Sequence, residues 1–353
     1  MVESSTKFSG ICIAIYLTYA LFVFFILPIL LPDPLTMSRT ILAQQINHLG
    51  NLTANTLEAG GQPKRSILVT FKGSGAISLL ESLTHVPGCY HHFSPLIAYR
   101  RRLTKKPQIE QALDELKALL NCDYSRSQSM LNLGMNTPTF RNFYGMQWKT
   151  CLMYSPEVCS DPETLAKICR IFPFLNMSVY NLSLRNLRAL LNQQDLNVRM
   201  LLLLRDPRAI MGLRANRPWC KTPGCLQPDD LCENMADDYE AAQILLKEYP
   251  QRFGIIRYEE LMKNPNQGLA SIFDFYGIPS KPVKEILKPN DGILDIKFKR
   301  NIDISLEPTF QWQHLLSAKE IMNIQATCKR AMSAWGYELI KDFKMKTLNN
   351  TID

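Results

Sequence analysis

The chain has 353 residues, of which 46% are hydrophobic and 20% are charged. This composition excludes an intrinsically disordered or collagen-like chain and leaves a folded globular protein. The formal net charge of +8 comes from 40 Lys and Arg against 32 Asp and Glu, which suits an anionic ligand. Because the most basic stretch is only the short segment from Arg100 to Lys106, we expect no nucleic-acid partner.

The N-terminal region contains one long apolar segment. Ile11–Leu31 is 21 residues without a charge, which is enough to cross a bilayer as one helix. Pro32, Asp33 and Pro34 follow in place of a small-residue cleavage site, so the segment is typical of an uncleaved anchor. We therefore predict a cytoplasmic tail (1–10), a transmembrane signal-anchor (11–31) and a luminal stem (32–64).

The flanking charges say little about orientation, because Lys7 precedes the span and Arg39 follows it. The glycosylation pattern Asn-X-Ser/Thr favours a luminal body. It occurs at Asn51, Asn176, Asn181 and Asn349.

Ten cysteines point to the same oxidising compartment. Nine follow the apolar segment, and two clusters stand out: Cys220, Cys225 and Cys232, and Cys151, Cys159 and Cys169. Zinc is the alternative, but neither cluster has C-x-x-C spacing or a histidine, so disulfides are favoured and no metal is expected. An odd number leaves one thiol free or bonded to another chain, and a disulfide-linked or a non-covalent homodimer stays open.

The first strand of the folded body is expected at 66–71, followed by Lys72, Gly73, Ser74 and Gly75 and then a helix over 76–83. A strand, a small-residue loop and a helix is the layout in which backbone N–H groups hold phosphate. It is not a Walker loop, because no Lys-Ser/Thr follows the second glycine, and a tight turn is the alternative interpretation.

Strands and helices then alternate. A strand is expected at 89–93, helices at 108–122 and 161–171, a short strand at 177–182 and a helix at 184–193. The run Val198–Leu204 predicts a buried strand, which ends at Arg205, and Asp206 and Pro207 begin a helix. Helices from 229 and 258, a strand at 253–257 and a helix at 317–335 follow. This alternation predicts one α/β, P-loop-like domain over 65–345, with a mainly parallel sheet covered by helices on both faces.

Several motifs occur together in a recognisable order. They are Leu204–Ile210 (LRDPRAI) with Arg214, the cysteine insertion at 219–232, Arg257–Leu261 (RYEEL) and Trp335-Gly336-Tyr337. In this order they resemble the Golgi carbohydrate sulfotransferases of the galactose, N-acetylglucosamine and N-acetylgalactosamine 6-O type. The resemblance is dense from about 184 to 277, and the anchor and stem fit it.

This resemblance implies a single-pass type II Golgi membrane protein with a luminal catalytic domain. It implies transfer of a sulfuryl group from 3′-phosphoadenosine 5′-phosphosulfate to a sugar hydroxyl of a glycoprotein or glycosaminoglycan. Lys72 and the loop Gly73, Ser74, Gly75 and Ala76 would stabilise the 5′ leaving group. Arg205 would bind the 3′-phosphate, within an element that includes Asp206, Pro207, Arg208 and Leu213.

Three positions depart from the family pattern. Ala76 replaces a hydroxyl residue, leaving Ser74 or Ser78 to supply it, and Leu213 replaces a serine. Ser94 replaces a glutamate that is a candidate general base, and a serine cannot act as a base unaided. The hypothesis is that His91 or His92 is the base; because neighbouring strand residues alternate, only one can face the site. The departures leave open a second function, a catalytically impaired protein that binds glycan or a partner enzyme. A nucleotide kinase is disfavoured because the Walker lysine is absent.

Overall fold

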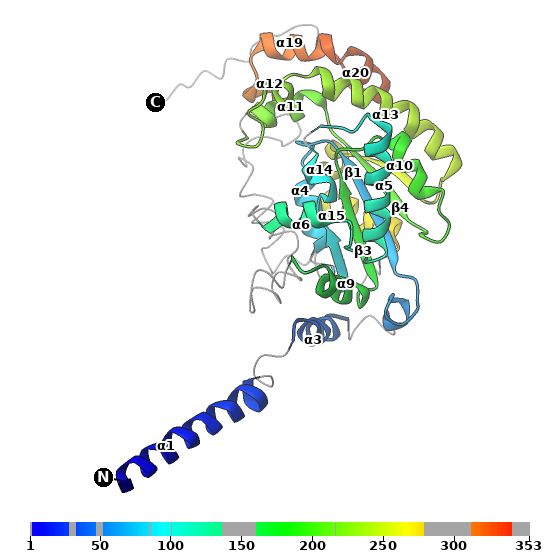
Figure 1. Cartoon of the computed structure of the whole chain (residues 1–353). Helices are drawn as coiled ribbons and strands as arrows, with labels where there is room; N and C mark the ends of the chain where they lie inside the picture. The colour runs from blue at the N-terminus through cyan, green and yellow to red at the C-terminus, as the bar shows by residue number, and fades with distance from the viewer. Residues whose placement is uncertain are drawn as a thin grey trace, which may run out of the picture.

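The N-terminal helix lies apart from the body of the molecule. The computed structural model describes residues 2–27, 33–46, 52–84, 86–99, 101–135, 160–215, 217–278 and 312–340. Helix α1 (Val2–Leu21) continues into a π-helical turn, Phe22–Ile26, and points away from the sheet (Figure 1). Within these ranges, no helix combines the length and the apolar character that a bilayer crossing requires.

The predicted stem is partly folded onto the body. Helix α3 (Pro34–Ile46) begins at Asp33, whose Oδ1 accepts a hydrogen bond from the backbone N–H of Thr36 at 3.1 Å. The helix buries Leu42 and Ile46 and packs against α9 (Pro162–Arg170). A short 3₁₀ turn at Leu52–Asn55 then leads to the first strand. This part of the stem therefore extends the hydrophobic core at the amino-terminal edge of the sheet.

The core is a five-stranded sheet in the order β2-β3-β1-β4-β5, and every strand pair is parallel. This confirms the predicted mainly parallel sheet. The strands are β1 (Lys64–Thr70), β2 (Cys89–His92), β3 (Phe174–Val179), β4 (Arg199–Leu204) and β5 (Phe253–Arg257). Strand β3 begins three residues before its predicted start, since Phe174 pairs with both Lys64 and Cys89.

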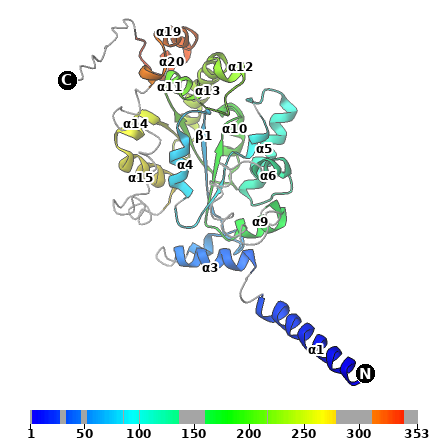
Figure 2. The same cartoon turned by 90° about the vertical axis from the view of Figure 1, so that its left-hand side faces the viewer.

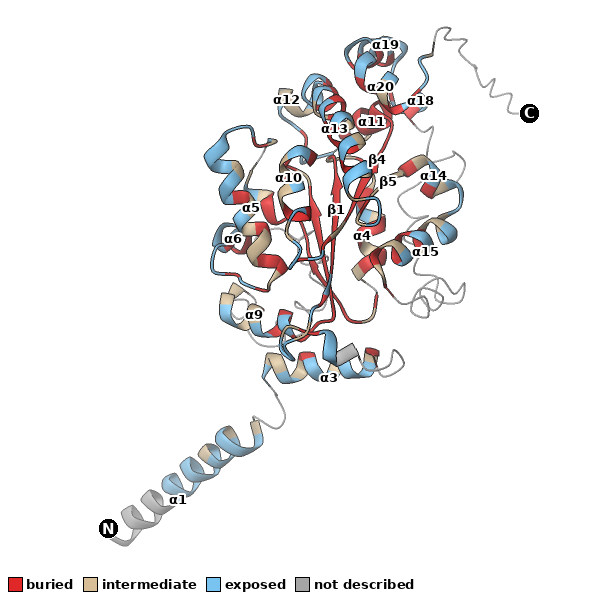
Figure 3. Cartoon of the chain, turned by 90° about the vertical axis from the view of Figure 1, so that its right-hand side faces the viewer, coloured by how far each residue is buried: buried red, intermediate tan, exposed pale blue. Residues whose placement is uncertain are grey.

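Helices cover both faces of the sheet, as predicted. Figures 2 and 3 show one layer of α4 (Ala76–Thr84), α14 (Tyr258–Lys263) and α15 (Pro265–Tyr276). The other layer holds α5 (Lys106–Leu120), α6 (Gln128–Met135) and α10 (Leu184–Leu191). Between them β1, β2, β3 and β4 are buried almost throughout, whereas the edge strand β5 is mostly half-buried (Figure 3).

The strand order places a topological switch point between β1 and β4. The chain leaves β1 toward β2 at one side of the sheet and leaves β4 toward β5 at the other side. Adjacent loops that run in opposite directions open a space at the carboxyl ends of their strands, where open α/β sheets bind ligands. In Figure 1 this end carries α11 (Pro207–Ala215) and α13 (Asp229–Glu248) and lies opposite α3 and α1.

Within the described residues, three disulfides brace the domain, which confirms the preference for disulfides over zinc at the cysteines that form them. Cys232 bonds to Cys328 and so ties α13 to the junction of α19 (Ala318–Thr327) and α20 (Lys329–Trp335). The other two bonds are Cys122–Cys169 and Cys220–Cys225. Cys89 is a free, buried thiol, and Cys151 and Cys159 lie outside the described residues.

Two predicted glycosylation positions are corrected by the fold. Asn176 lies in β3 at 1% exposure, and its amide nitrogen donates to the Ser66 hydroxyl at 2.7 Å. Asn181 is 5% exposed, and its amide nitrogen donates to the carbonyl of Leu96 at 3.1 Å. A glycan on either nitrogen would replace these hydrogen bonds and would not fit in the core. Asn51 and Asn349 lie outside the described residues.

Candidate functional site

The loop after β1 is a compact turn that depends on two glycines. Gly73 and Gly75 have φ values of +96° and +85°, which L side chains rarely adopt. The Ser74 N–H donates to the Phe71 carbonyl at 3.0 Å, and α4 begins directly after the turn at Ala76. The first N–H groups of α4 have no partner within the helix, so the loop ends in a set of amide donors suited to an anion.

The serine of this loop serves the fold. Thr70 Oγ1 lies 2.9 Å from the Leu203 carbonyl and 2.6 Å from Ser74 Oγ. A carbonyl can only accept, so the threonine donates to Leu203 and the Ser74 hydroxyl donates to the threonine. The Ser74 side chain, 1% exposed, therefore ties the loop to β4 and does not replace the hydroxyl missing at Ala76. Ser78, in the first turn of α4, is partly exposed.

Beyond β4, two of the three charged residues of the RDPR motif neutralise one another. Asp206 Oδ2 lies 2.7 Å from Arg208 Nη2, and Asp206 Oδ1 accepts the backbone N–H of Arg208 at 2.8 Å. The Arg208 guanidinium also donates to Gln325 at 2.7 Å and stacks on the Trp312 ring at 4.3 Å. Both charged side chains are buried. These contacts hold α11 against the C-terminal helices, and a direct role of either side chain toward a ligand stays a prediction.

Arg205 is placed differently, against an aromatic ring shared with the glycine loop. Its guanidinium carbon lies 4.1 Å from the centroid of the Tyr258 ring. A Cβ added to Gly75 would come within 2.4 Å of the same ring, so the loop backbone rests on it. Tyr258 directly follows β5, at the carboxyl edge of the sheet. One ring thus brings the loop after β1 and the arginine after β4 together.

The rest of the RYEEL segment fixes this arrangement. Glu259 Oε1 accepts the backbone N–H of Asp206 at 2.8 Å, and burial raises the pKa of the Glu259 carboxyl. Arg257 stacks on the Tyr337 ring at 4.2 Å. The RDPR turn, RYEEL and the C-terminal Trp-Gly-Tyr therefore form one packed unit, which explains why these separated motifs occur together.

A second arginine connects the glycine loop to α11. Arg214 Nε donates to the Lys72 carbonyl at 2.9 Å, and Arg214 Cγ would lie 3.3 Å from a Cβ on Gly73. Burial, and then the charge of Arg214, lower the pKa of the partly exposed Lys72 ammonium. Two cations held this close favour an anion beside them.

Lys72, Arg205 and the amides of Gly73–Ala76 therefore gather at the carboxyl edge of β1, β4 and β5, where Lys72 is partly exposed and Arg205 is buried beneath the Tyr258 contact. Pro207 is buried in the first turn of α11, and Leu213, partly exposed on that helix, offers no polar group. Sequence reasoning did not assign a site role to Tyr258 or Arg214. The position of Tyr258 directly after the apolar segment Phe253–Arg257 was the signal that could have revealed its role.

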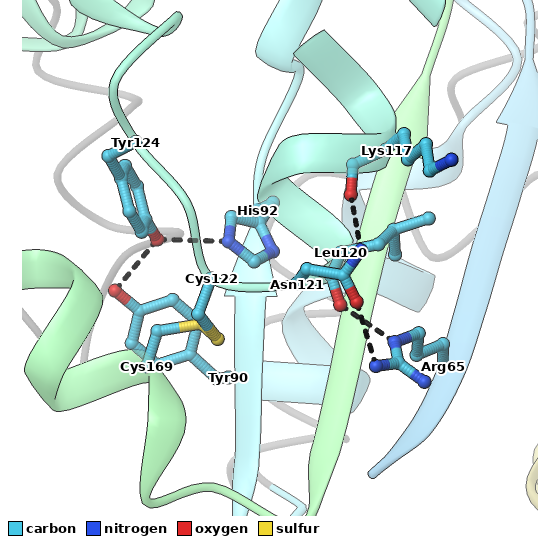
Figure 4. The surroundings of a disulfide bond; sticks show 9 residues. All are labelled: Arg65, Tyr90, His92, Lys117, Leu120, Asn121, Cys122, Tyr124 and Cys169. Carbon is cyan, nitrogen blue, oxygen red and sulfur yellow. Dashed lines mark hydrogen bonds between the residues drawn. A yellow bond between two sulfur atoms is a disulfide. The ribbon is translucent and has the colours of Figure 1, made fainter. Parts of the chain in front are cut away.

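The histidine hypothesis for the general base is contradicted by burial. His91 and His92 lie within β2 at 3% and 0% exposure, on opposite faces of the sheet. His92 Nε2 is 2.9 Å from the Tyr124 hydroxyl, which in turn meets Tyr90 (Figure 4). Burial lowers the pKa of His91 to about 4 and that of His92 to about 3. Both rings are neutral core groups that a sugar hydroxyl cannot reach.

The comparison with known families agrees with this geometry. The sequence matches the sulfotransferase domain family over residues 63–291, well over half of the chain. The chain belongs to this family. The matched range contains the loop after β1, the RDPR turn and RYEEL, so the resemblance seen in the sequence is confirmed.

Its relatives are carbohydrate sulfotransferases. Carbohydrate sulfotransferase 3 of Tetronarce californica is 29% identical over 179 residues, covering 44% of this chain and 40% of that protein. Carbohydrate sulfotransferase 6 of Homo sapiens is 26% identical over 200 residues, covering 49% and 51%. The chain thus spans about half the length of these relatives. Among solved structures, the sulfotransferase domain of the Synechococcus PCC 7002 olefin synthase aligns with 14% identity and a TM-score of 0.40, covering 78% of this chain and 95% of that one.

Proposed function

We propose that this protein transfers a sulfuryl group from 3′-phosphoadenosine 5′-phosphosulfate to a sugar hydroxyl. The observation that carries the proposal is the Tyr258 ring, which contacts the Gly75 backbone and the Arg205 guanidinium at once. The nucleotide carries phosphate groups at both its 3′ and 5′ positions, so it needs two anion sites at one crevice. Sulfotransferase family membership supports the same reaction.

The residues divide the work by position. When bound, the nucleotide supplies the sulfuryl group. Lys72 and the amides of Gly73–Ala76 would hold the charge that develops on the 5′-phosphate as it leaves. Arg205 would hold the 3′-phosphate, because a guanidinium stacked on an aromatic ring keeps its planar donors in a fixed orientation. The glycine φ values fit this role, since side chains at these positions would strain the turn.

The acceptor belongs to the same proposal. The named relatives are carbohydrate sulfotransferases, and we assign this chain a glycan acceptor on a glycoprotein or proteoglycan. We also propose that the apolar segment Ile11–Leu31 anchors the protein in the Golgi membrane with the domain in the lumen. The disulfides support an oxidising compartment. The crevice lies at the end of the sheet opposite α1, so an anchored domain would present it away from the membrane (Figure 1).

Calorimetry tests the nucleotide site directly. The full chain, purified in detergent, is titrated with adenosine 3′,5′-bisphosphate, and binding is expected. Lys72→Ala and Arg205→Ala should each weaken it by about tenfold or more, the usual cost of a lost charged contact. Arg185→Ala, on the exposed surface of α10, is the matched control and should bind normally. Absence of binding by the unaltered chain would contradict the enzymatic proposal.

The buried histidines favour a second candidate, a protein that binds nucleotide or glycan without transfer. Neither His91 nor His92 reaches the crevice, and Ser94 occupies the family position of the candidate base. Sulfate transfer from a labelled donor to a panel of glycans separates the two functions. Binding of the bisphosphate with no labelled product on any glycan would favour the second candidate.

A further inference from the structure

A cationic surface with an exposed tryptophan adjoins the proposed nucleotide crevice. It consists of Trp219, Arg217 and Lys221 on the loop before the short helix α12 (Pro223–Leu226), together with Arg101. We call these four residues the insertion patch. All four are exposed, and the Trp219 side chain is 50% exposed although it is large and apolar.

Direct contacts place the insertion patch beside the glycine loop. Arg214, which donates to the Lys72 carbonyl, also directs Nη1 at the carbonyl of Cys225, 3.4 Å away. Cys225 is bonded to Cys220, the residue that follows Trp219. Arg101 reaches the same loop, because a Cβ on Gly224 would lie 2.7 Å from its Nη2. Arg214 thus links the backbone of Lys72 to the disulfide loop that carries the patch.

The charges of the patch are not neutralised within the described part of the chain. There, no carboxylate lies within 4.0 Å of the Arg101, Arg217 or Lys221 side chains. The acidic side chains that follow this loop in sequence are Asp229, Asp230 and Glu233 in α13. Burial lowers the pKa of the Arg214 guanidinium, and the negative charge of Asp230 partly offsets this shift. The positive charge of these exposed side chains is therefore available to attract an anionic ligand.

A disulfide holds the aromatic residue at this position. The five-residue separation of Cys220 and Cys225 closes a small ring directly after Trp219. The Trp219 peptide lies in a turn in which Cys220 N–H donates to the Arg217 carbonyl at 3.0 Å. An exposed indole on a backbone constrained in this way offers a flat apolar face, and the C–H face of a sugar ring is a suitable partner for it. Cations on both sides add selection for negative charge.

We infer that the insertion patch binds the acceptor and selects a glycan that already carries sulfate or carboxylate groups. This rests on the proposed sulfotransferase function, which it extends by naming the acceptor class. When one sugar stacks on Trp219, the adjoining sugars of the same glycan would lie toward Lys72, where the sulfuryl group is held. Charged substituents on flanking sugars would pair with Arg101, Arg217 and Lys221. A neutral glycan would use the indole alone.

Binding of three oligosaccharides of equal length tests the inference: a sulfated one, its desulfated form and a neutral N-acetyllactosamine oligomer. The full chain in detergent should bind the sulfated form about tenfold or more tightly than the neutral one, and added salt should reduce the difference. Arg101→Glu and Lys221→Glu should remove this preference. Trp219→Ala should weaken all three by about three- to tenfold, and Lys319→Glu, on exposed α19, should change nothing.

The result that overturns the inference is a neutral oligomer that binds as tightly as the sulfated one, or charge reversals without effect. An oligonucleotide of matched charge that binds as well as the sulfated glycan would also overturn it. Titration with adenosine 3′,5′-bisphosphate runs in parallel and separates the two proposals. If the nucleotide fails to bind while the patch selects sulfated glycan, the enzymatic function fails and the glycan site stands. If the nucleotide binds normally and the patch variants bind the oligosaccharides like the unaltered chain, only the inference about the insertion patch is refuted.

Discussion

The two sides of the carboxyl edge of the sheet differ in how they use their polar residues. On the β1–β4–β5 side, Lys72, Arg205 and the glycine loop meet around Tyr258, and Asp206, Arg208 and Glu259 brace them. On the β2 side, His91 and His92 are buried as neutral rings. The first side has the parts of an anion-binding site, whereas the second offers no accessible acid or base from its strand. The two sides of one sheet edge therefore differ in the charge that they hold: the first carries cations and backbone amides, and the second carries neutral buried rings.

The largest expected effect concerns the bracing of the binding side. Asp206→Ala leaves the buried Arg208 guanidinium without its carboxylate, and it removes the acceptor for the Arg208 N–H. Breaking a buried ion pair costs about 3–5 kcal/mol, so the free energy of unfolding should fall by that amount in urea denaturation. The exposed pair Arg126–Asp114 is the matched control, and Asp114→Ala should cost less than about 1 kcal/mol. Equal losses in the two variants would show that Asp206 does not brace the site.

The next prediction concerns the β2 side and its pH dependence. The folded-state pKa values of His91 and His92, about 4 and about 3, lie below the ordinary value of 6.5. The unfolded chain therefore binds more protons below pH 6.5, and stability present above that pH is lost as pH falls toward 4. Each histidine contributes a slope of up to about 1.4 kcal/mol per pH unit in this range.

Replacing both histidines should flatten this slope. His91→Gln with His92→Gln removes both titrating groups, and denaturant unfolding at several pH values between 6.5 and 4.5 measures the change. The Glu115 carboxyl, whose pKa burial raises to about 7, acts with the opposite sign but is the same in both proteins. An unchanged slope would mean that the imidazoles are solvated, and the general-base hypothesis would then return.

A smaller effect is expected at the contact between the glycine loop and Tyr258. Gly75→Ala places a Cβ at φ +85° and 2.4 Å from the ring, so the loop must move. Strain at such a position costs about 1–3 kcal/mol, and affinity for adenosine 3′,5′-bisphosphate should fall more than stability does. Calorimetry and urea denaturation on the same sample measure both. Gly60→Ala, also at positive φ but with nothing within 4 Å, is the control for backbone strain alone. Normal nucleotide affinity in Gly75→Ala would show that the glycine loop is not part of the nucleotide site.

The smallest effect tests a family position on α11. Leu213→Ser restores a hydroxyl on the partly exposed face of the helix. One neutral hydrogen bond is worth about 1 kcal/mol, so nucleotide affinity should rise by about fivefold. The same substitution at Leu226, which is exposed on α12, should leave affinity unchanged. No gain at position 213 would mean that this turn of α11 does not face the nucleotide.

The sheet and its two loops were predictable because they depend on local patterns. The run Met200–Leu204 is apolar on both faces, which is typical of a strand that is buried on both sides. Arg205, Asp206 and Pro207 then mark a strand end and a helix start in the sequence itself. The sequence motifs also identified the family.

The roles of individual side chains were less predictable, because they depend on register and on distant partners. Asn176 fits the glycosylation pattern, but its pairing beside Ser66 and His91 buries it. In the sequence, Arg208 resembles a ligand-binding cation. In the structure its guanidinium contacts Gln325 and Trp312, which lie more than a hundred residues away in sequence. Likewise, the partner of Cys232 is Cys328 and lies outside its sequence cluster.

In the proposed complex, one ligand with two phosphates joins the glycine loop and Arg205. Titrating the full chain and its Arg205→Ala and Lys72→Ala variants with adenosine 3′,5′-bisphosphate and with adenosine 5′-monophosphate tests it directly. Arg205→Ala should weaken the bisphosphate to the affinity of the monophosphate and leave the monophosphate unchanged, whereas Lys72→Ala should weaken both. A bisphosphate preference that survives in Arg205→Ala would contradict the assignment of this arginine to the 3′-phosphate.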